Sequence, residues 1–164
     1  MSRILVIGIG NPLRGDDGLG RHAAEKLTER LRESIFEVVA CHQLMPELAE
    51  RVAQAKMVIF LDACMGTKAG ALKLTRIAST GKGQPSSFSH ELQPAELLAI
   101  AEALYGARPR GVVLSMTGES FGYSTELSAP VQRALPRLLR RAEQVARGAV
   151  PLLAESAVRN HYRH

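Results

Sequence analysis

Five apolar runs alternate along the chain with segments of helical periodicity, and this alternation limits the fold more than any other feature. The apolar runs predict strands at residues 3–9, 36–41, 57–61, 71–77 and 111–116. Apolar residues recur at helical spacing over residues 17–31, 47–55, 94–104 and 130–145. Strands that alternate with helices pair in parallel and carry helices on the sheet faces. The pattern therefore predicts an α/β fold, with a three-layer, twisted, mostly parallel five-stranded sheet and helices on both faces.

The length and composition indicate one soluble domain. The chain has 164 residues, of which 46% are hydrophobic and 23% charged, as is typical of globular proteins. No apolar run approaches the length of a membrane span, and no signal-like segment opens the chain. Cys41 and Cys64 are expected to be thiols in a reducing compartment. We therefore expect a cytoplasmic protein without a membrane partner, and a frayed tail from about residue 148 onward.

Residues 62–70, which end in Gly70, connect the third and fourth predicted strands. A glycine-containing connection between two strands is typical of a hairpin. We therefore expect these two strands to be neighbours in the sheet.

The formal charge of +5 raises the question of a nucleic-acid partner. The basic residues concentrate at residues 108–110 and 136–147, where Arg137, Arg140 and Arg141 have the spacing of a solvated helix face. Four Phe, three Tyr and no Trp leave little aromatic surface on which bases can stack. We therefore expect no nucleic-acid partner.

All three aspartates of the chain lie just after predicted strands. Asp16 and Asp17 occur in RILVIGIGNPLRGDDGLG, residues 3–20, and Asp62 follows the third apolar run. Ligands of parallel sheets bind beyond the carboxyl ends of the strands. Capping of the first helix explains one aspartate of the adjacent pair. It does not explain the other aspartate of the pair or Asp62.

The ligand at these aspartates is expected to be a cation. The glycines of residues 3–20 are similar to those of a dinucleotide-binding turn, but two adjacent carboxylates would repel a pyrophosphate at the helix N-terminus. His90 precedes the helix predicted at residue 94, although a lone histidine is more often a surface or capping residue. Asp17, Asp62 and His90 together would form a site with open positions, for which zinc, nickel and manganese all remain open.

Two nucleophiles provide an alternative interpretation. GESFG, residues 118–122, matches the G-x-S-x-G nucleophile elbow and makes Ser120 a candidate. The elbow needs a helix directly after the serine, whereas the residues up to Pro130 have the composition of a loop. Cys64 is the second candidate nucleophile, with a buried structural thiol as the alternative.

Four segments together resemble the hydrogenase maturation protease family. They are GIGNPLRGDDGLG, VIFLDAC, SHELQPAELLAIAEALYG and ELSAPVQRALPRL, and their order and approximate spacing match up to about Val145. Members of this family are endopeptidases that trim the C-terminal extension from the large-subunit precursor of nickel-iron hydrogenases, and their fold is a twisted sheet wrapped by helices. Where some members have an IQP-like segment after the last strand, this chain has SMTGESFGYSTELS.

The resemblance implies roles for particular residues. The family's metal-contacting acid, aspartate and histidine fall on Asp17, Asp62 and His90, and Asp16 becomes a capping or supporting residue. The implied activity is that of a nickel-dependent aspartic or metallo-type endopeptidase whose nickel arrives within the precursor, with zinc or another divalent ion also open. The metal would anchor the precursor, polarise the scissile carbonyl or activate water. The alternative is a non-cleaving, metal-binding chaperone of hydrogenase assembly.

Overall fold

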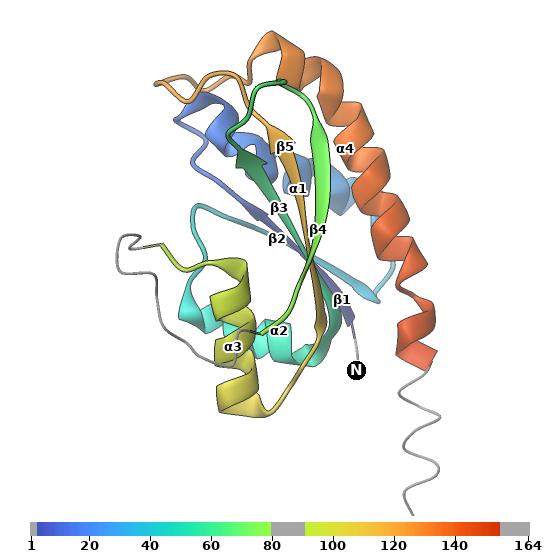
Figure 1. Cartoon of the computed structure of the whole chain (residues 1–164). Helices are drawn as coiled ribbons and strands as arrows, with labels where there is room; N and C mark the ends of the chain where they lie inside the picture. The colour runs from blue at the N-terminus through green and yellow to red at the C-terminus, as the bar shows by residue number, and fades with distance from the viewer. Residues whose placement is uncertain (1–2, 80–90, 155–164) are drawn as a thin grey trace, which may run out of the picture.

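The computed structural model describes residues 3–79 and 91–154, and its centre is a five-stranded sheet (Figure 1). The strands are β1 (Arg3–Ile9), β2 (Phe36–Cys41), β3 (Ala55–Cys64), β4 (Leu72–Ile77) and β5 (Arg110–Thr117). Their order in the sheet is β2-β1-β3-β5-β4. All neighbouring pairs are parallel except β4 and β5. The predicted mostly parallel α/β sheet is confirmed.

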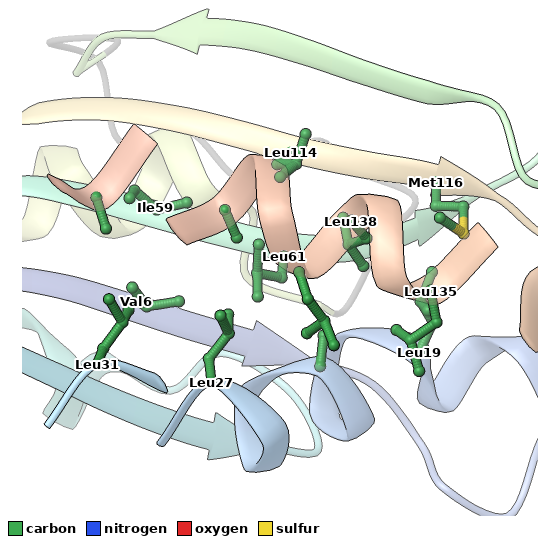
Figure 2. Close-up of a cluster of buried hydrophobic side chains, with 14 of the residues drawn as sticks. Val6, Leu19, Leu27, Leu31, Ile59, Leu61, Leu114, Met116, Leu135 and Leu138 are labelled. Atoms are coloured by element: carbon green, nitrogen blue, oxygen red, sulfur yellow. The ribbon is translucent and has the colours of Figure 1, made fainter. Parts of the chain in front are cut away.

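Helices cover both faces of the sheet. They are η1 (Gly15–Gly18), α1 (Leu19–Arg30), η2 (Pro46–Leu48), α2 (Ala49–Gln54), α3 (Pro94–Tyr105) and α4 (Ala129–Gly148). One core cluster joins α1 and α4 to the sheet, and Figure 2 shows Leu27 and Leu138 of these helices directed toward Leu61 of β3. A second cluster joins α2 and α3 to the opposite face through Val52 and Leu97. No helix of the described residues is long and apolar enough to cross a membrane.

Strand β3 extends beyond its predicted end and includes Asp62. The apolar run ends at Leu61, but the parallel ladder with β5 continues through the pairs Asp62–Ser115 and Cys64–Thr117. The alternation of side chains places Phe60 in the cluster of α2 and α3 and Leu61 in the cluster of α1 and α4. Asp62 therefore lies on the α2 and α3 side of the sheet, at the end of its central strand.

The predicted hairpin between the third and fourth strands is wrong. Both edges of β3 are occupied, by β1 on one side and β5 on the other. The chain after β3 instead crosses the end of β5, where Gly70 N–H donates to Thr117 O at 2.8 Å. Strand β4 then pairs with the outer edge of β5.

The chain remains packed beyond the point where the tail was expected to begin. Ala149 is buried, and Leu152 and Leu153 pack against the core cluster of α1 and α4. Residues 155–164 lie outside the described residues.

Helix α1 approaches the sheet closely because two glycines face each other across the contact. A Cβ at Gly20 would collide with the backbone oxygens of Leu61 and Ile9, and a Cβ at Gly8 would collide with Gly20 O. We expect Gly20→Ala to lower the free energy of unfolding by about 3 kcal/mol, because neither strand can move without disturbing the ladder. Gly148→Ala, in α4 with no atom near its Cβ position, is the matched control and should change stability by less than about 1 kcal/mol. Equal urea-unfolding midpoints for the two variants would show that α1 is not closely packed at Gly20.

Candidate functional site

Asp17 and Asp62 lie at the same edge of the sheet. Asp17 belongs to η1, which follows β1, and Asp62 lies near the end of β3, the parallel neighbour of β1. The Asp17 carboxylate is near enough to raise the pKa of Asp62, and so is Glu91, in the segment that leads into α3. Two of the three predicted site residues are therefore brought together, whereas His90 lies outside the described residues.

Each of the two carboxylates has one oxygen held by a backbone N–H. Asn11 N–H donates to Asp17 Oδ2 at 3.0 Å, and Ala63 N–H donates to Asp62 Oδ1 at 2.9 Å. Over residues 3–79 and 91–154, the second oxygen of each carboxylate accepts no hydrogen bond. Each carboxylate is thus oriented by the main chain and keeps an oxygen available for a ligand.

The environment of Asp62 disfavours its charged form. Burial is the largest cause and raises the pKa of Asp62 to about 7, with smaller contributions from the negative charges of Asp17 and Glu91. The hydrogen bond from Ala63 N–H opposes this rise. A proton or a cation at this position relieves the repulsion, so the site is suited to proton exchange near neutral pH or to cation binding.

The two aspartates supply oxygen ligands but not a complete metal centre. No group of three or more His, Cys, Asp or Glu side chains suited to a metal ion occurs in the described part of the chain. Carboxylate oxygens suit divalent cations, and a site with zinc or nickel normally adds nitrogen or sulfur ligands. The two carboxylates fit part of the predicted set. A third ligand would have to come from outside the described residues or from a bound substrate.

The carboxylate of Asp16 has other partners than that of Asp17. Asp16 is fully buried, and its carboxylate accepts backbone N–H bonds from Glu119 at 2.7 Å, Ser120 at 3.0 Å and Ser128 at 2.8 Å. The Ser128 hydroxyl donates a fourth hydrogen bond at 2.7 Å. Asp16 therefore fastens the loop between β5 and α4 to η1, rather than capping its own helix.

Ser120 does not lie in a nucleophile elbow, in agreement with the loop expected between it and Pro130. Helix α4 begins at Ala129, so the strand, serine and helix arrangement of the elbow is not formed. The backbone of Ser120 instead holds Asp16, with its N–H on the carboxylate and its carbonyl accepting Asp16 N–H at 2.8 Å.

Both cysteines are free thiols near the carboxyl ends of the strands. Cys64 Sγ lies 3.6 Å from Thr117 Oγ1, which gives it a packing contact on β5. Burial raises the pKa of the Cys41 thiol, with Arg21 lowering it and the Asp62 charge raising it further. Cys41 is therefore a neighbour of the aspartate site, held in the thiol form.

A cavity of about 980 Å³ lies near the opposite end of the sheet. It is lined by residues of the start of β5, the end of β4 and the C-terminal part of α4, among them Arg110, Ile77 and Val145. Neither Asp17 nor Asp62 borders it. The ionisable groups at the carboxyl ends of the strands, rather than this cavity, identify the candidate site.

Comparisons with known proteins point in one direction. No family model matches the chain. The sequence is 34% identical over 148 residues to the hydrogenase expression/formation protein HoxM of Azotobacter vinelandii, covering 85% of this chain and 70% of that protein. The structure is similar to that of the [NiFe] hydrogenase maturation protease HycI from Thermococcus kodakarensis KOD1, with a TM-score of 0.68, 26% identity, and coverage of 89% of this chain and 91% of that one.

A second solved structure has the same fold. The hydrogenase maturating endopeptidase HybD from E. coli is similar with a TM-score of 0.70 over 90% of this chain and 93% of that one. Its sequence identity is 22%, so this likeness concerns the fold alone.

Proposed function

The chain belongs to the hydrogenase maturation protease family, and from that premise we propose that it is an endopeptidase that removes the C-terminal extension of a nickel-iron hydrogenase large-subunit precursor after nickel insertion. The observation that carries the proposal is the proximity of Asp17, in η1 after β1, to Asp62, near the end of β3. Each carboxylate has one oxygen that accepts no hydrogen bond from the described residues. A free oxygen of this kind is needed to bind a metal that the substrate carries.

In this proposal, Asp17, Asp62 and His90 contact the nickel that the precursor carries, and zinc or another divalent ion fits the same ligand types. Nickel belongs to the substrate, and its charge offsets the repulsion between Asp17 and Asp62. Binding through the metal fixes the precursor at the ends of the parallel strands. Cleavage of a peptide adds water to the scissile carbonyl and delivers a proton to the departing amine. Before the metal binds, burial and the charge of Asp17 keep Asp62 partly protonated near neutral pH, and binding of the nickel would release that proton.

The proposal includes a cytoplasmic location. Cys41 and Cys64 are both free thiols, as expected in a reducing compartment.

We expect His90→Ala and Asp17→Asn each to reduce processing of a nickel-loaded precursor by about 10³-fold, because a metal contact worth several kcal/mol is lost. His42→Ala is the matched control, since His42 is exposed in the loop after β2, and it should process the precursor at the wild-type rate. The measurement is the rate of mass loss of the precursor. Normal processing by both site variants would refute the proposed ligand set.

A non-cleaving chaperone of hydrogenase assembly is the second candidate function. The relative HoxM is named a hydrogenase expression/formation protein, a description that covers assembly as well as cleavage. Such a chaperone would bind the precursor through the same residues and leave its mass unchanged.

A further inference from the structure

Two loops that are far apart in the sequence are paired beside the candidate site. They are residues 11–16, after β1, and residues 118–128, after β5, and we refer to them as the paired loops. Gly15 N–H donates to Ser124 O at 2.8 Å, and Ser124 N–H donates to Leu13 O at 3.1 Å. Figure 1 shows the two loops side by side, in blue and orange. Together with the buried Asp16 carboxylate, these bonds give the paired loops a fixed backbone.

The paired loops expose two large apolar side chains. Leu13 is 58% exposed and Tyr123 is 96% exposed, and Ser124 N–H on Leu13 O brings their backbones together. Seven large hydrophobic side chains are exposed among the described residues, and four of them follow the parallel strands at this one end: Leu13, Met45, Met65 and Tyr123. Apolar side chains gathered on a rigid support are typical of a surface that binds another protein, because little conformational entropy is lost on binding.

The charge of the paired loops differs from that of the chain as a whole. Glu119 and Glu126 are exposed and lie within four residues of Tyr123 in the sequence. Neither forms an ion pair with the described residues, and Arg14 is the one exposed basic residue of the two loops. The chain carries a formal charge of +5. A local excess of carboxylates around apolar side chains favours a partner whose contact surface is apolar with a basic rim.

A short series of hydrogen bonds connects this surface to the candidate site. Leu13 N–H donates to Asn11 Oδ1 at 3.0 Å, and Asn11 N–H donates to Asp17 Oδ2 at 3.0 Å. A partner seated on Leu13 is therefore held next to the carboxylate of Asp17.

We propose that Leu13 and Tyr123 form the docking surface for the folded body of the large-subunit precursor, which meets them with an apolar patch rimmed by Lys or Arg. This inference rests on the proposed function. The paired loops bind the folded body of the precursor, while the aspartates act on the C-terminal extension of the precursor. Docking at the paired loops positions the substrate before any bond is cut. Loss of the docking contacts therefore raises KM and leaves kcat unchanged.

The test compares two double variants of the full chain. Leu13→Ser with Tyr123→Ser removes the docking side chains. Leu104→Ser with Tyr105→Ser is the matched control, because Leu104 and Tyr105 are 66% and 53% exposed at the end of α3. The probe is the nickel-iron large-subunit precursor of the source organism. Its affinity is measured by surface plasmon resonance on the nickel-free form, and its cleavage kinetics on the nickel-loaded form.

The docking variant should bind the precursor at least about tenfold more weakly, with KM raised by the same factor, kcat unchanged and the unfolding temperature unaltered. The control variant should stay within about twofold of the wild type on every measure. Equal affinities for the wild type and the docking variant would overturn the inference while leaving the proposed cleavage intact. Equal weakening by both variants would also overturn it, since binding would then follow general surface hydrophobicity.

Binding measured without cleavage separates this inference from the proposed function. A wild-type protein that binds the precursor but leaves its mass unchanged would refute the protease, and the inference would stand if the docking variant alone lost affinity. A wild-type protein that neither binds nor cleaves the precursor would overturn both.

The predicted basic rim has its own test. Glu119→Lys with Glu126→Lys should slow association with the precursor by about tenfold at low salt, and the difference should shrink at high salt. Glu29→Lys with Glu50→Lys makes the same change in net charge on exposed positions of α1 and α2, and it should have a smaller effect. Equal slowing by the two pairs would contradict a local role for Glu119 and Glu126.

Discussion

Asp62→Asn is expected to abolish processing of the precursor and, at the same time, to stabilise the protein. Processing should fall by about 10³-fold, because a neutral amide is a much weaker ligand for the metal than a carboxylate. The stability gain follows from burial, which raises the pKa of Asp62 to about 7, with help from the charges of Asp17 and Glu91. Asn retains an oxygen for the hydrogen bond from Ala63 N–H. Functional sites often contain a residue that lowers the stability of the fold, so that its substitution makes the protein more stable.

The pH dependence of this gain has a definite sign. The ordinary pKa of an aspartate is 3.8, below the folded value of about 7, so the folded state retains a proton that the unfolded state releases. The wild type therefore loses stability as the pH rises between these two values, and the loss is complete above about pH 7. Urea unfolding should show Asp62→Asn to be more stable than the wild type by about 1–3 kcal/mol at pH 8, with a smaller difference at pH 5. A variant less stable than the wild type at pH 8 would contradict this description of the site.

Asp16→Ala is expected to have the opposite effect, lowering the free energy of unfolding by about 3–5 kcal/mol. The substitution leaves three backbone N–H groups, of Glu119, Ser120 and Ser128, without their buried acceptor. It also leaves the Ser128 hydroxyl without its partner. Asp16→Asn keeps one acceptor oxygen and should cost less.

The contribution of Asp16 to stability should disappear in acid. Burial alone would raise the pKa of Asp16, but the hydrogen bonds from Ser120, Ser128 and Glu119 outweigh it and hold the pKa below 3.8. A lowered pKa means that the stabilisation is complete above the unfolded value and is lost as the pH falls through the folded value. The stability difference between the wild type and Asp16→Ala should therefore be constant near neutral pH and narrow below about pH 4. A difference that does not change between pH 7 and pH 2 would show that the charge of Asp16 is not what holds the loop.

The two adjacent aspartates show what a sequence can and cannot reveal about this site. Both follow an apolar run, and the fold rule for parallel sheets correctly places Asp17 and Asp62 at one edge. The separate role of Asp16 depends on Ser128, which lies 112 residues away in the sequence and gives no local signal. Glu91 was also missed as a neighbour of Asp62, although its position in the segment before α3 could have suggested it.

The fold was predictable where local signals dominate. Strands β1 and β2 begin and end at the predicted residues, and their mostly apolar segments RILVIGI and FEVVAC are followed directly by Gly10 and His42. Strand β3 continues past its apolar run because the ladder with β5 supplies partners for Asp62 and Cys64. The position of β4 depends on which strand edge is left unpaired, and this is a property of the whole sheet that the connection around Gly70 does not encode.

The most direct test of the account is the intact mass of a large-subunit precursor after incubation with the purified protein. The precursor is prepared in nickel-loaded and nickel-free forms, and Asp62→Asn serves as the inactive control. We expect the nickel-loaded precursor to lose the mass of its C-terminal extension with the wild type only, and the nickel-free precursor to keep its mass. An unchanged mass for the nickel-loaded precursor, in a mixture where the two proteins form a complex, would contradict the protease and identify the protein as an assembly chaperone.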